Sequence, residues 1–368
     1  MLVLVDGDLP TIVDVTVVDR LGSHVSQRWA HWRATVDLDE YFARWDHVPT
    51  ADSGHGEADF IHSLQPDSVL DAGCGMGRLA IELHSRGIPV VGVDLDDDLL
   101  SYARRKAPDQ QWVHEDLAIA QFDRQFHVVA MPGNVMIFCR PEDRRAVLHT
   151  ATQHLVPNGM VVAGFALESD KTALTLDEYD QLCSDCDLTL VERWSTWDRQ
   201  PFDGGNYAVS VHRRSDRFNV HDMLFEARSQ IVRLGAVELA DLLNGPNPPT
   251  VIDTRTSTDR SRFGVIPGSV HVPRTVLEWH LDPANGYRHP TVSSFDQQLV
   301  IVCNGGYSSS VAAAGLKRIG YRNIADLRGG VHAWALAGLP LVSPDHSHLD
   351  TAPHLTTSED LVIPKETS

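Results

Sequence analysis

The sequence predicts two α/β domains in tandem, each built on a mainly parallel sheet covered by helices. Two observations support this prediction. Apolar segments of strand length alternate with helical segments in two separate blocks, and such alternation indicates parallel strands joined by crossover helices. At 368 residues the chain is also more than twice the length of a typical domain, so a single hydrophobic core is not expected.

Residues 21–214 form the first block. Residues 1–20, where apolar and acidic side chains alternate, are expected to be an N-terminal arm, and 24–64 has helical spacing broken near 51–56. Strands are expected at 68–72, 89–94, 111–115, 126–131 and 160–166, with helices at 78–86, 99–106 and 142–155. A helix at 175–186 precedes strands at 188–196 and 207–212, and the short loop between these strands makes them antiparallel.

Residues 230–341 form the second block, after a polar linker at 215–229. The middle of this second block is rich in Pro, Gly and His, and its apolar residues show no clear helical or strand periodicity. Strands are expected at 250–253, 299–302 and 324–327, and helices at 309–319 and 331–337. Residues 342–368 are polar and lack apolar period, so we expect a disordered tail.

The charge and composition exclude several classes of partner. Thirty-one Lys and Arg face 50 Asp and Glu, a net charge of −19, whereas nucleic-acid and anionic-membrane binders present basic surfaces. No run of about 18 apolar residues is present, so no membrane span is expected. The first 20 residues lack the basic start of a signal peptide, and five scattered cysteines favour free thiols in a reducing cytoplasm.

Three glycines at alternate positions occupy the segment Val69-Leu-Asp-Ala-Gly-Cys-Gly-Met-Gly-Arg78, where a strand turns into a helix. Glycine allows the unusual backbone angles of such a turn and lets a ligand lie close to it. A dinucleotide fingerprint would place its third glycine at position 78, which is Arg78 here. Asp94 ends the next strand, where a carboxylate can accept hydrogen bonds from both ribose hydroxyls. The pattern predicts a nucleoside site at these strand ends.

At these residues the chain resembles the class I S-adenosylmethionine-dependent methyltransferases, over about residues 24–214. The resemblance implies a Rossmann-like seven-stranded sheet and S-adenosylmethionine as cofactor. It places the glycine loop under the methionine moiety, Asp94 at the ribose, Asp116-Leu117 at the adenine and Gly133-Asn134 beside the sulfonium. The cofactor-binding residues that it implies are Asp71, Ala72, Gly73, Cys74, Gly75, Gly77, Asp94, Leu95, Asp116, Leu117, Gly133 and Asn134.

A small-molecule methyl acceptor is expected. Members of this family that methylate nucleic-acid amino groups carry Asn/Asp-Pro-Pro-aromatic after the fourth strand, where this chain has Met131-Pro-Gly-Asn134. The segment His55-Gly-Glu57 resembles one that precedes the glycine loop in some bacterial small-molecule methyltransferases, so His55 and Glu57 are candidate substrate-binding residues. Methyl transfer from a sulfonium chiefly requires alignment. His55, Glu57 and Asn134 stay open as bases, and a surface-loop role for His55 stays open too.

Cys303 follows the apolar strand Leu299–Val302 directly and opens the loop Cys303-Asn-Gly-Gly-Tyr-Ser-Ser309, after which a helix begins. The N-terminal amides and the positive dipole end of that helix face back towards the sulfur. Such a site stabilises a thiolate, and it would equally stabilise a persulfide anion.

This block resembles a rhodanese domain over about residues 230–341. The matching segments are Val251-Ile-Asp-Thr-Arg255, Ile266-Pro-Gly-Ser-Val-His-Val-Pro273, the Cys303 loop and Asp326-Leu-Arg-Gly-Gly330. The resemblance implies that Cys303 is catalytic and carries persulfide sulfur, and that Asp253 and Arg255 are structural or rim residues. The implied cradle of the persulfide is Asn304, Gly305, Gly306, Tyr307, Ser308 and Ser309. Many thiosulfate-using rhodaneses have Arg where this chain has Ser308, which favours a small thiol persulfide as sulfane-sulfur donor.

Two functions stay open for the whole chain. In the first, a small-molecule methyltransferase is fused to a sulfurtransferase domain, and adjacency alone suggests a sulfur-containing acceptor. In the second, the rhodanese-like domain is a non-catalytic binding or regulatory module. A scaffold with two decayed sites is disfavoured by the intact glycine loop. Cys183-Ser-Asp-Cys186 has metal-ligand spacing, but no second pair completes a zinc site, so no metal is predicted.

Overall fold

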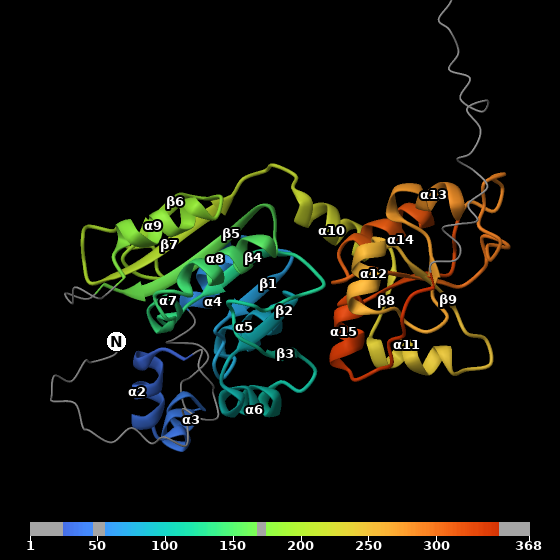
Figure 1. Ribbon diagram of the computed structural model, residues 1–368. Helices are drawn as coiled ribbons and strands as arrows, with labels where there is room; N and C mark the ends of the chain where they lie inside the picture. The colour runs from blue at the N-terminus through green and yellow to red at the C-terminus, as the bar shows by residue number, and fades with distance from the viewer. Residues whose placement is uncertain (1–24, 47–55, 168–173, 346–368) are drawn as a thin grey trace, which may run out of the picture. The chain divides into compact units, whose positions relative to one another are not determined.

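The computed structural model describes residues 25–46, 56–167 and 174–345, and the chain divides into two compact units, 1–221 and 222–368 (Figure 1). The predictions for the arm at 1–20, for His55 and for the tail beyond 345 lie outside the described residues. No helix in these three ranges is both long enough and apolar enough to cross a membrane.

The first unit is built on a seven-stranded sheet in the order β3-β2-β1-β4-β5-β7-β6. Only β7 is antiparallel to its neighbours β5 and β6, so the predicted Rossmann-like sheet with an antiparallel closing pair is confirmed. The strands are β1 Val69–Ala72, β2 Val90–Asp94, β3 Gln111–His114, β4 Phe126–Met131, β5 Leu155–Ala166, β6 Leu188–Trp194 and β7 Tyr207–Arg214. The strand order reverses between β1 and β4, and open α/β sheets bind ligands beyond the carboxyl ends of strands at such a point.

Helices cover both faces of this sheet because its central strands are apolar on both sides. Along β4, Val128 and Ala130 pack on the face covered by α4 and α5, and Val129 and Met131 pack on the face covered by α7, α8 and α9. The helices are α2 Gln27–Thr35, α3 Leu38–Asp46, α4 Gly56–Ser63, α5 Arg78–Ser85, α6 Asp97–Lys106, α7 Val135–Phe138, α8 Arg144–Gln153 and α9 Leu176–Asp185.

One predicted boundary in this unit is wrong. The sequence predicts a helix over 142–155 and a strand beginning at 160, but β5 already begins at Leu155 and runs through the turn-forming residues Pro157, Asn158 and Gly159. Asn158 takes a positive φ of 64°, and the pairing of β4 with β5 shifts register between Phe126 and Val128. The turn residues are therefore absorbed as an irregularity within a continuous strand.

The second unit is built on a five-stranded parallel sheet in the order β10-β9-β11-β12-β8. The strands are β8 Val232–Leu234, β9 Thr250–Asp253, β10 Val270–His271, β11 Leu299–Val302 and β12 Ile324–Leu327. The helices are α10 Val220–Ser229, α11 Ala236–Leu243, α12 Ser257–Phe263, α13 Leu277–His280, α14 Ser308–Arg318 and α15 Gly330–Leu336, with the 3₁₀ helix η2 at Arg274–Val276. The smaller α/β fold predicted for this block is confirmed.

Sequence analysis missed β8, β10 and α11 to α13. Strands of two or three residues are too short to show a period, and 215–229 was expected to be a linker with possible helical structure, which α10 now defines. Leu224, Phe225 and Ala227 of that helix are buried in the second unit.

Trp112 of β3 lies across two glycines of the first unit and fixes how closely β2, β3 and α5 approach each other. A Cβ built on Gly77 would lie 2.3 Å from a ring carbon of Trp112, and one built on Gly92 would lie 2.4 Å from the same ring. The indole Nε1 donates a hydrogen bond to the Ala107 carbonyl at 2.9 Å. The ring therefore fills the space that side chains at 77 and 92 would need.

This contact predicts that Gly77→Ala destabilises the protein far more than Gly87→Ala. Both glycines have nearly the same positive φ, +82° and +83°, but a Cβ on Gly87 would have nothing within 4 Å. Both variants therefore lose about 1 kcal/mol to left-handed strain, and Gly77→Ala loses about 2 kcal/mol more to the clash with Trp112. Urea unfolding of the full chain measures both. Equal losses in the two variants would contradict the packing argument.

Candidate functional site

The predicted cofactor residues lie at or just beyond the carboxyl ends of four neighbouring strands of the first sheet, which we call the carboxyl edge. The glycine loop 73–77 follows β1, Asp94 ends β2, Asp116 lies two residues after β3, and Gly133 lies two residues after β4. These strands are parallel and adjacent in the order β3-β2-β1-β4, so their carboxyl ends share one edge. The structure thus brings these residues into one row.

Two different physical constraints explain why glycine occupies these positions in the row. Gly73, Gly75 and Gly77 all have positive φ, and a Cβ on Gly73 would lie 2.6 Å from Val135 Cγ2. In contrast, a Cβ on Gly75 would meet only Leu99 at 3.8 Å, and one on Gly133 would meet nothing within 4 Å. Gly73 and Gly77 are therefore required by packing, whereas a Cβ on Gly75 would make only an ordinary contact and Gly133 borders open space.

Two buried carboxylates hold the loop. Asp71 Oδ2 accepts a hydrogen bond from the Ala80 N–H at 3.0 Å, while its buried Oδ1 has no partner among the described residues. Asp94 Oδ2 accepts from the Gly75 N–H at 2.7 Å, and its Oδ1 accepts from the Asp96 N–H at 2.8 Å. Burial raises the pKa of Asp71 to about 7 and that of Asp94 to about 6. Both acids therefore support the loop from within the protein.

The other predicted cofactor residues have partners inside the protein. Ala72 is the last residue of β1, Leu95 follows Asp94, and the buried Cys74 is kept as a thiol because burial raises its pKa well above the ordinary value. Asp116 Oδ1 accepts from the Ala118 N–H at 2.9 Å and so caps the turn after β3. Leu117 packs against the core on the α8 face.

Asn134 and Glu57 lie at connections beside this row. Asn134 has a φ of +72°, donates its N–H to the Gly164 carbonyl at 3.1 Å, and accepts from the Ala166 N–H through Oδ1 at 2.8 Å. It therefore fastens the loop after β4 to β5. Both carboxylate oxygens of Glu57 accept from Arg78 Nη2 at 3.2 Å, which places α4 beside the first turn of α5.

An aromatic cluster to which the sequence pattern gave no role lies over part of this edge. The rings of Trp29 and Trp32 on α2 stack with centroids 4.6 Å apart, and both contact Phe138 of α7, at 5.5 and 6.3 Å. Arg33 of the same helix binds Asp96 at 2.9 Å, next to the carboxylate of Asp94. The aromatic spacing in 24–64 was the available signal, but it could not show what the rings face.

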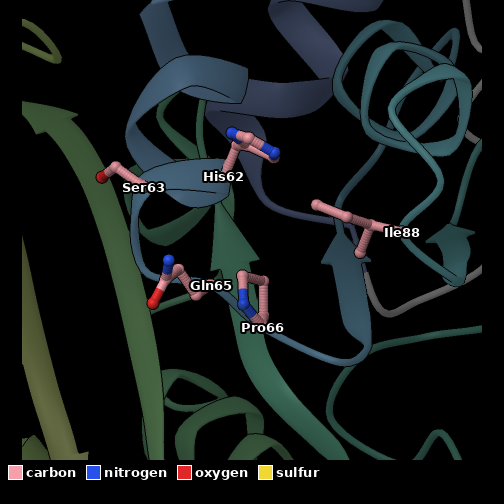
Figure 2. A pocket seen from close by; sticks show the side chains of 5 residues that line it. All are labelled: His62, Ser63, Gln65, Pro66 and Ile88. Carbon is pink, nitrogen blue, oxygen red and sulfur yellow. The ribbon is translucent and has the colours of Figure 1, made fainter.

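A cavity elsewhere in this unit does not belong to the row. It has a volume of about 370 Å³ and is lined by His62, Ser63, Gln65, Pro66 and Ile88 (Figure 2). These residues precede β1 and β2 in the chain, so the cavity lies at the amino ends of these strands, opposite the glycine loop.

In the second unit, Cys303 lies directly after β11 and is 6% exposed. Its Sγ accepts a hydrogen bond from the Gly306 N–H at 3.2 Å and lies 3.2 Å from Ser309 Oγ. Burial acts to raise the pKa of the thiol, but hydrogen bonds from two hydroxyls and two backbone N–H groups of Tyr307, Ser308 and Ser309 outweigh it. The pKa is therefore lower than the ordinary value, as a nucleophilic thiol requires.

The loop keeps its N–H groups turned towards the sulfur because its carbonyls are held on the other side. The Val331 and His332 N–H groups, in the first turn of α15, donate to the carbonyls of Cys303 and Asn304, both at 3.0 Å. A Cβ on Gly330 would lie 2.4 Å from both carbonyl oxygens, so only glycine permits this approach. Of the predicted cradle residues, Gly306, Tyr307, Ser308 and Ser309 thus supply hydrogen-bonding groups to Sγ, and Asn304 is held against α15.

Other polar groups of the second unit serve its framework. Asp253 binds Arg255 at 2.7 Å and Arg260 at 3.3 Å, and all three residues are buried. Their role is to fix the end of β9. In the first unit, Cys183 and Cys186 are buried free thiols whose pKa values burial raises. Within the described ranges, no group of three or more His, Cys, Asp and Glu is arranged to hold a metal ion.

Comparisons with known proteins match each unit separately. A family model described as a methyltransferase domain matches residues 69–159, and one described as a rhodanese-like domain matches 235–337. A sulfurtransferase of Allochromatium vinosum is 36% identical over 95 residues, which are 26% of this chain and 79% of that protein. A dTDP-3-amino-3,4,6-trideoxy-alpha-D-glucopyranose N,N-dimethyltransferase of Streptomyces venezuelae is 31% identical over 108 residues, 28% of this chain and 46% of the relative.

Among solved structures, a TehB-like SAM-dependent methyltransferase from Corynebacterium glutamicum is 30% identical, with a TM-score of 0.44 and coverage of 48% of this chain and 97% of that chain. The chain spans less than half the length of the curated sugar N,N-dimethyltransferases that it matches.

The raised pKa of Asp71 predicts that the chain loses stability as the pH rises from about 4 to about 7. Over this range the folded state keeps a proton on Asp71 that the unfolded state releases, so the free energy of unfolding falls with pH by at most about 1.4 kcal/mol per unit. Asp71→Asn removes this titrating carboxyl and makes the dependence shallower, leaving the part due to Asp94, whereas Asp109→Asn at an exposed site leaves it unchanged. Urea unfolding between pH 4.5 and 8 measures the slopes. If the free energy of unfolding of Asp71→Asn changed with pH as steeply as that of the wild type, Asp71 would not be the source of the pH dependence.

Proposed function

The chain is a class I S-adenosylmethionine-dependent methyltransferase with a C-terminal rhodanese-like domain, and on this premise we propose a function for each domain. The first domain transfers a methyl group from S-adenosylmethionine to a small molecule. The second carries sulfane sulfur on Cys303. The five cysteines are all free thiols, which supports the reducing cytoplasm as the place of action.

The residues at the carboxyl edge of the first sheet fit the cofactor. Gly133 borders open space, a Cβ on Gly75 would make only an ordinary contact with Leu99, and the buried Oδ1 of Asp71 has no protein partner among the described residues. We assign Asp94 to the ribose hydroxyls, Asp116 to the adenine amine and the glycine loop to the methionine moiety. The cofactor supplies a methyl group on a sulfonium, whose sulfur is a good leaving group. The part of the protein is to hold donor and acceptor in line and to exclude water.

The acceptor is proposed to be a small molecule that needs no strong base. Two relatives are named as N,N-dimethyltransferases of dTDP-linked amino sugars, which supports an acceptor of this size. Burial raises the pKa of Tyr207 to about 12, so its hydroxyl keeps its proton, and Glu57 is paired with Arg78. Both are therefore poorly suited to remove a proton, which supports catalysis by alignment. A sulfur-containing acceptor would make use of the fused second domain.

The sulfur-carrying role of Cys303 is supported by its two hydrogen bonds with Gly306 N–H and Ser309 Oγ. The thiolate would attack the outer sulfur of a small persulfide R–S–SH. A bond forms between Sγ and that sulfur, the donor S–S bond breaks, and R–S⁻ leaves, so Cys303 becomes a persulfide. Once its proton is lost to solvent, the N–H groups of the cradle stabilise the terminal anion.

Asp94→Ala is expected to weaken S-adenosylhomocysteine binding by about 2–3 kcal/mol, because the charge-assisted bonds to the ribose are lost. Asp94→Asn is expected to lose less, since its amide oxygen still accepts one backbone N–H of the loop. Asp97→Asn on α6 removes an exposed carboxylate and is the matched control, with unchanged affinity. Titration calorimetry on the full chain measures all three. An Asp94→Ala variant that binds as tightly as the wild type would overturn the assignment.

Incubation with a small thiol persulfide is expected to add one sulfur atom to the Cys303 peptide, visible by mass spectrometry. The addition should be absent in Cys303→Ser and retained in Cys139→Ser, which removes a thiol of the first unit whose pKa burial raises to about 12. Methyl transfer should survive in both variants. If several sulfane donors leave the wild-type peptide without added sulfur, the second domain is a binding or regulatory module instead.

A further inference from the structure

The anion site around Cys303 contains no cationic side chain of its own. Residues 304–309 are Asn, Gly, Gly, Tyr, Ser and Ser. Two guanidinium groups reach the loop from elsewhere, Arg228 at the end of α10 and Arg233 in β8. Their Nη2 atoms donate to the same carbonyl, that of Gly306, at 3.1 and 3.3 Å.

This carbonyl belongs to the peptide group whose N–H is that of Tyr307. The Tyr307 N–H is one of the donors that stabilise the Cys303 thiolate. Two cationic donors on the oxygen of a peptide group draw electron density from it, which strengthens its N–H as a donor. They also fix the plane of the peptide, and therefore the direction in which the N–H points.

The two arginines differ in their other partners. Arg233 Nε binds Asp326 Oδ1 at 3.0 Å, and Asp326 Oδ2 accepts from the Ser310 hydroxyl at 2.6 Å, so much of the charge of Arg233 is matched by a buried carboxylate. The guanidinium of Arg228 lies 5.5 Å from the ring centroid of Tyr307, which is 53% exposed. Arg228 is thus held by the loop residue whose N–H it polarises.

We propose that Arg228 is a positioning residue for Cys303, which acts through the Gly306 carbonyl to aim the Tyr307 N–H at Sγ and brings positive charge to a loop that has none. The inference rests on the proposed sulfur-carrying role of Cys303. Arg228 and Arg233 precede residue 235, where the match to the rhodanese-like family model begins. The sulfur site therefore depends on the helix that follows the last strand of the methyltransferase domain in the chain.

The test is the pH dependence of Cys303 alkylation by iodoacetamide in the full chain, read on the Cys303 peptide by mass spectrometry. Arg228→Gln is expected to raise the midpoint of this dependence by about 0.5–1 pH unit, a three- to tenfold loss of thiolate well below the midpoint. Arg228→Lys keeps the charge but loses the planar fork, so a smaller rise, about 0.3 unit, is expected. Arg322→Gln removes an exposed guanidinium of the same domain, 79% accessible and paired with Asp296, and should leave the midpoint unchanged.

The proposal would be overturned if the alkylation midpoint of Arg228→Gln equalled that of the wild type, or if Arg322→Gln raised the midpoint as much as Arg228→Gln does. Circular dichroism establishes whether the variants fold. If Arg228→Gln does not fold, Arg228→Lys is the deciding variant, and a midpoint equal to that of the wild type in Arg228→Lys overturns the proposal as well. Alkylation needs no sulfur donor. A chain that takes up no sulfur but shifts its midpoint in Arg228→Gln therefore refutes the sulfur-carrying role alone, and a chain that takes up sulfur without such a shift refutes the role of Arg228 alone.

Discussion

Close approach of one backbone to another, or to an aromatic ring, is the constraint on which both candidate sites depend. In the first domain, the Trp112 ring leaves no room for a side chain at Gly77, so the loop after β1 turns sharply into α5. In the second, the carbonyls of Cys303 and Asn304 lie where a Cβ of Gly330 would be. Both loops therefore present backbone N–H groups at the carboxyl end of a strand, where an anion or a polar ligand can accept them.

The two sites use buried acids for the same purpose. Asp71 and Asp94 accept backbone N–H groups of the glycine loop and of α5, and Asp326 accepts the Ser310 hydroxyl at the start of α14. Burial of a carboxylate costs free energy, and hydrogen bonds of this kind offset part of the cost. In the first domain the cost is visible as raised pKa values of Asp71 and Asp94, whereas Asp326 is paired with Arg233. These buried acids therefore make the loop of each site rigid.

The domains differ in how their reactive groups are supplied. Methyl transfer takes its reactive group from a bound cofactor, so the first domain needs a shaped edge and an acceptor pocket, and the aromatic cluster of α2 with Phe138 lies beside that edge. In the proposed sulfur transfer the reactive group belongs to the chain itself, so the second domain would have to stabilise a charge on Sγ of Cys303. This difference explains why the second site is fully assembled in the protein alone, down to the guanidinium groups on the Gly306 carbonyl.

The sequence by itself determined the fold class of both domains, the strands 126–131 and 299–302, the row of glycines and acids at the strand ends, and Cys303 in its loop. These features are local, because each depends on apolar runs, turns and spacings within about ten residues. Only the tertiary structure decided which residues meet across the chain. Trp112 packs on Gly77 from another strand, and Arg228 and Arg233 reach Gly306 from more than 70 residues away. A contact between distant segments leaves no period or motif in the sequence, since it arises only when the sheet brings its strands side by side.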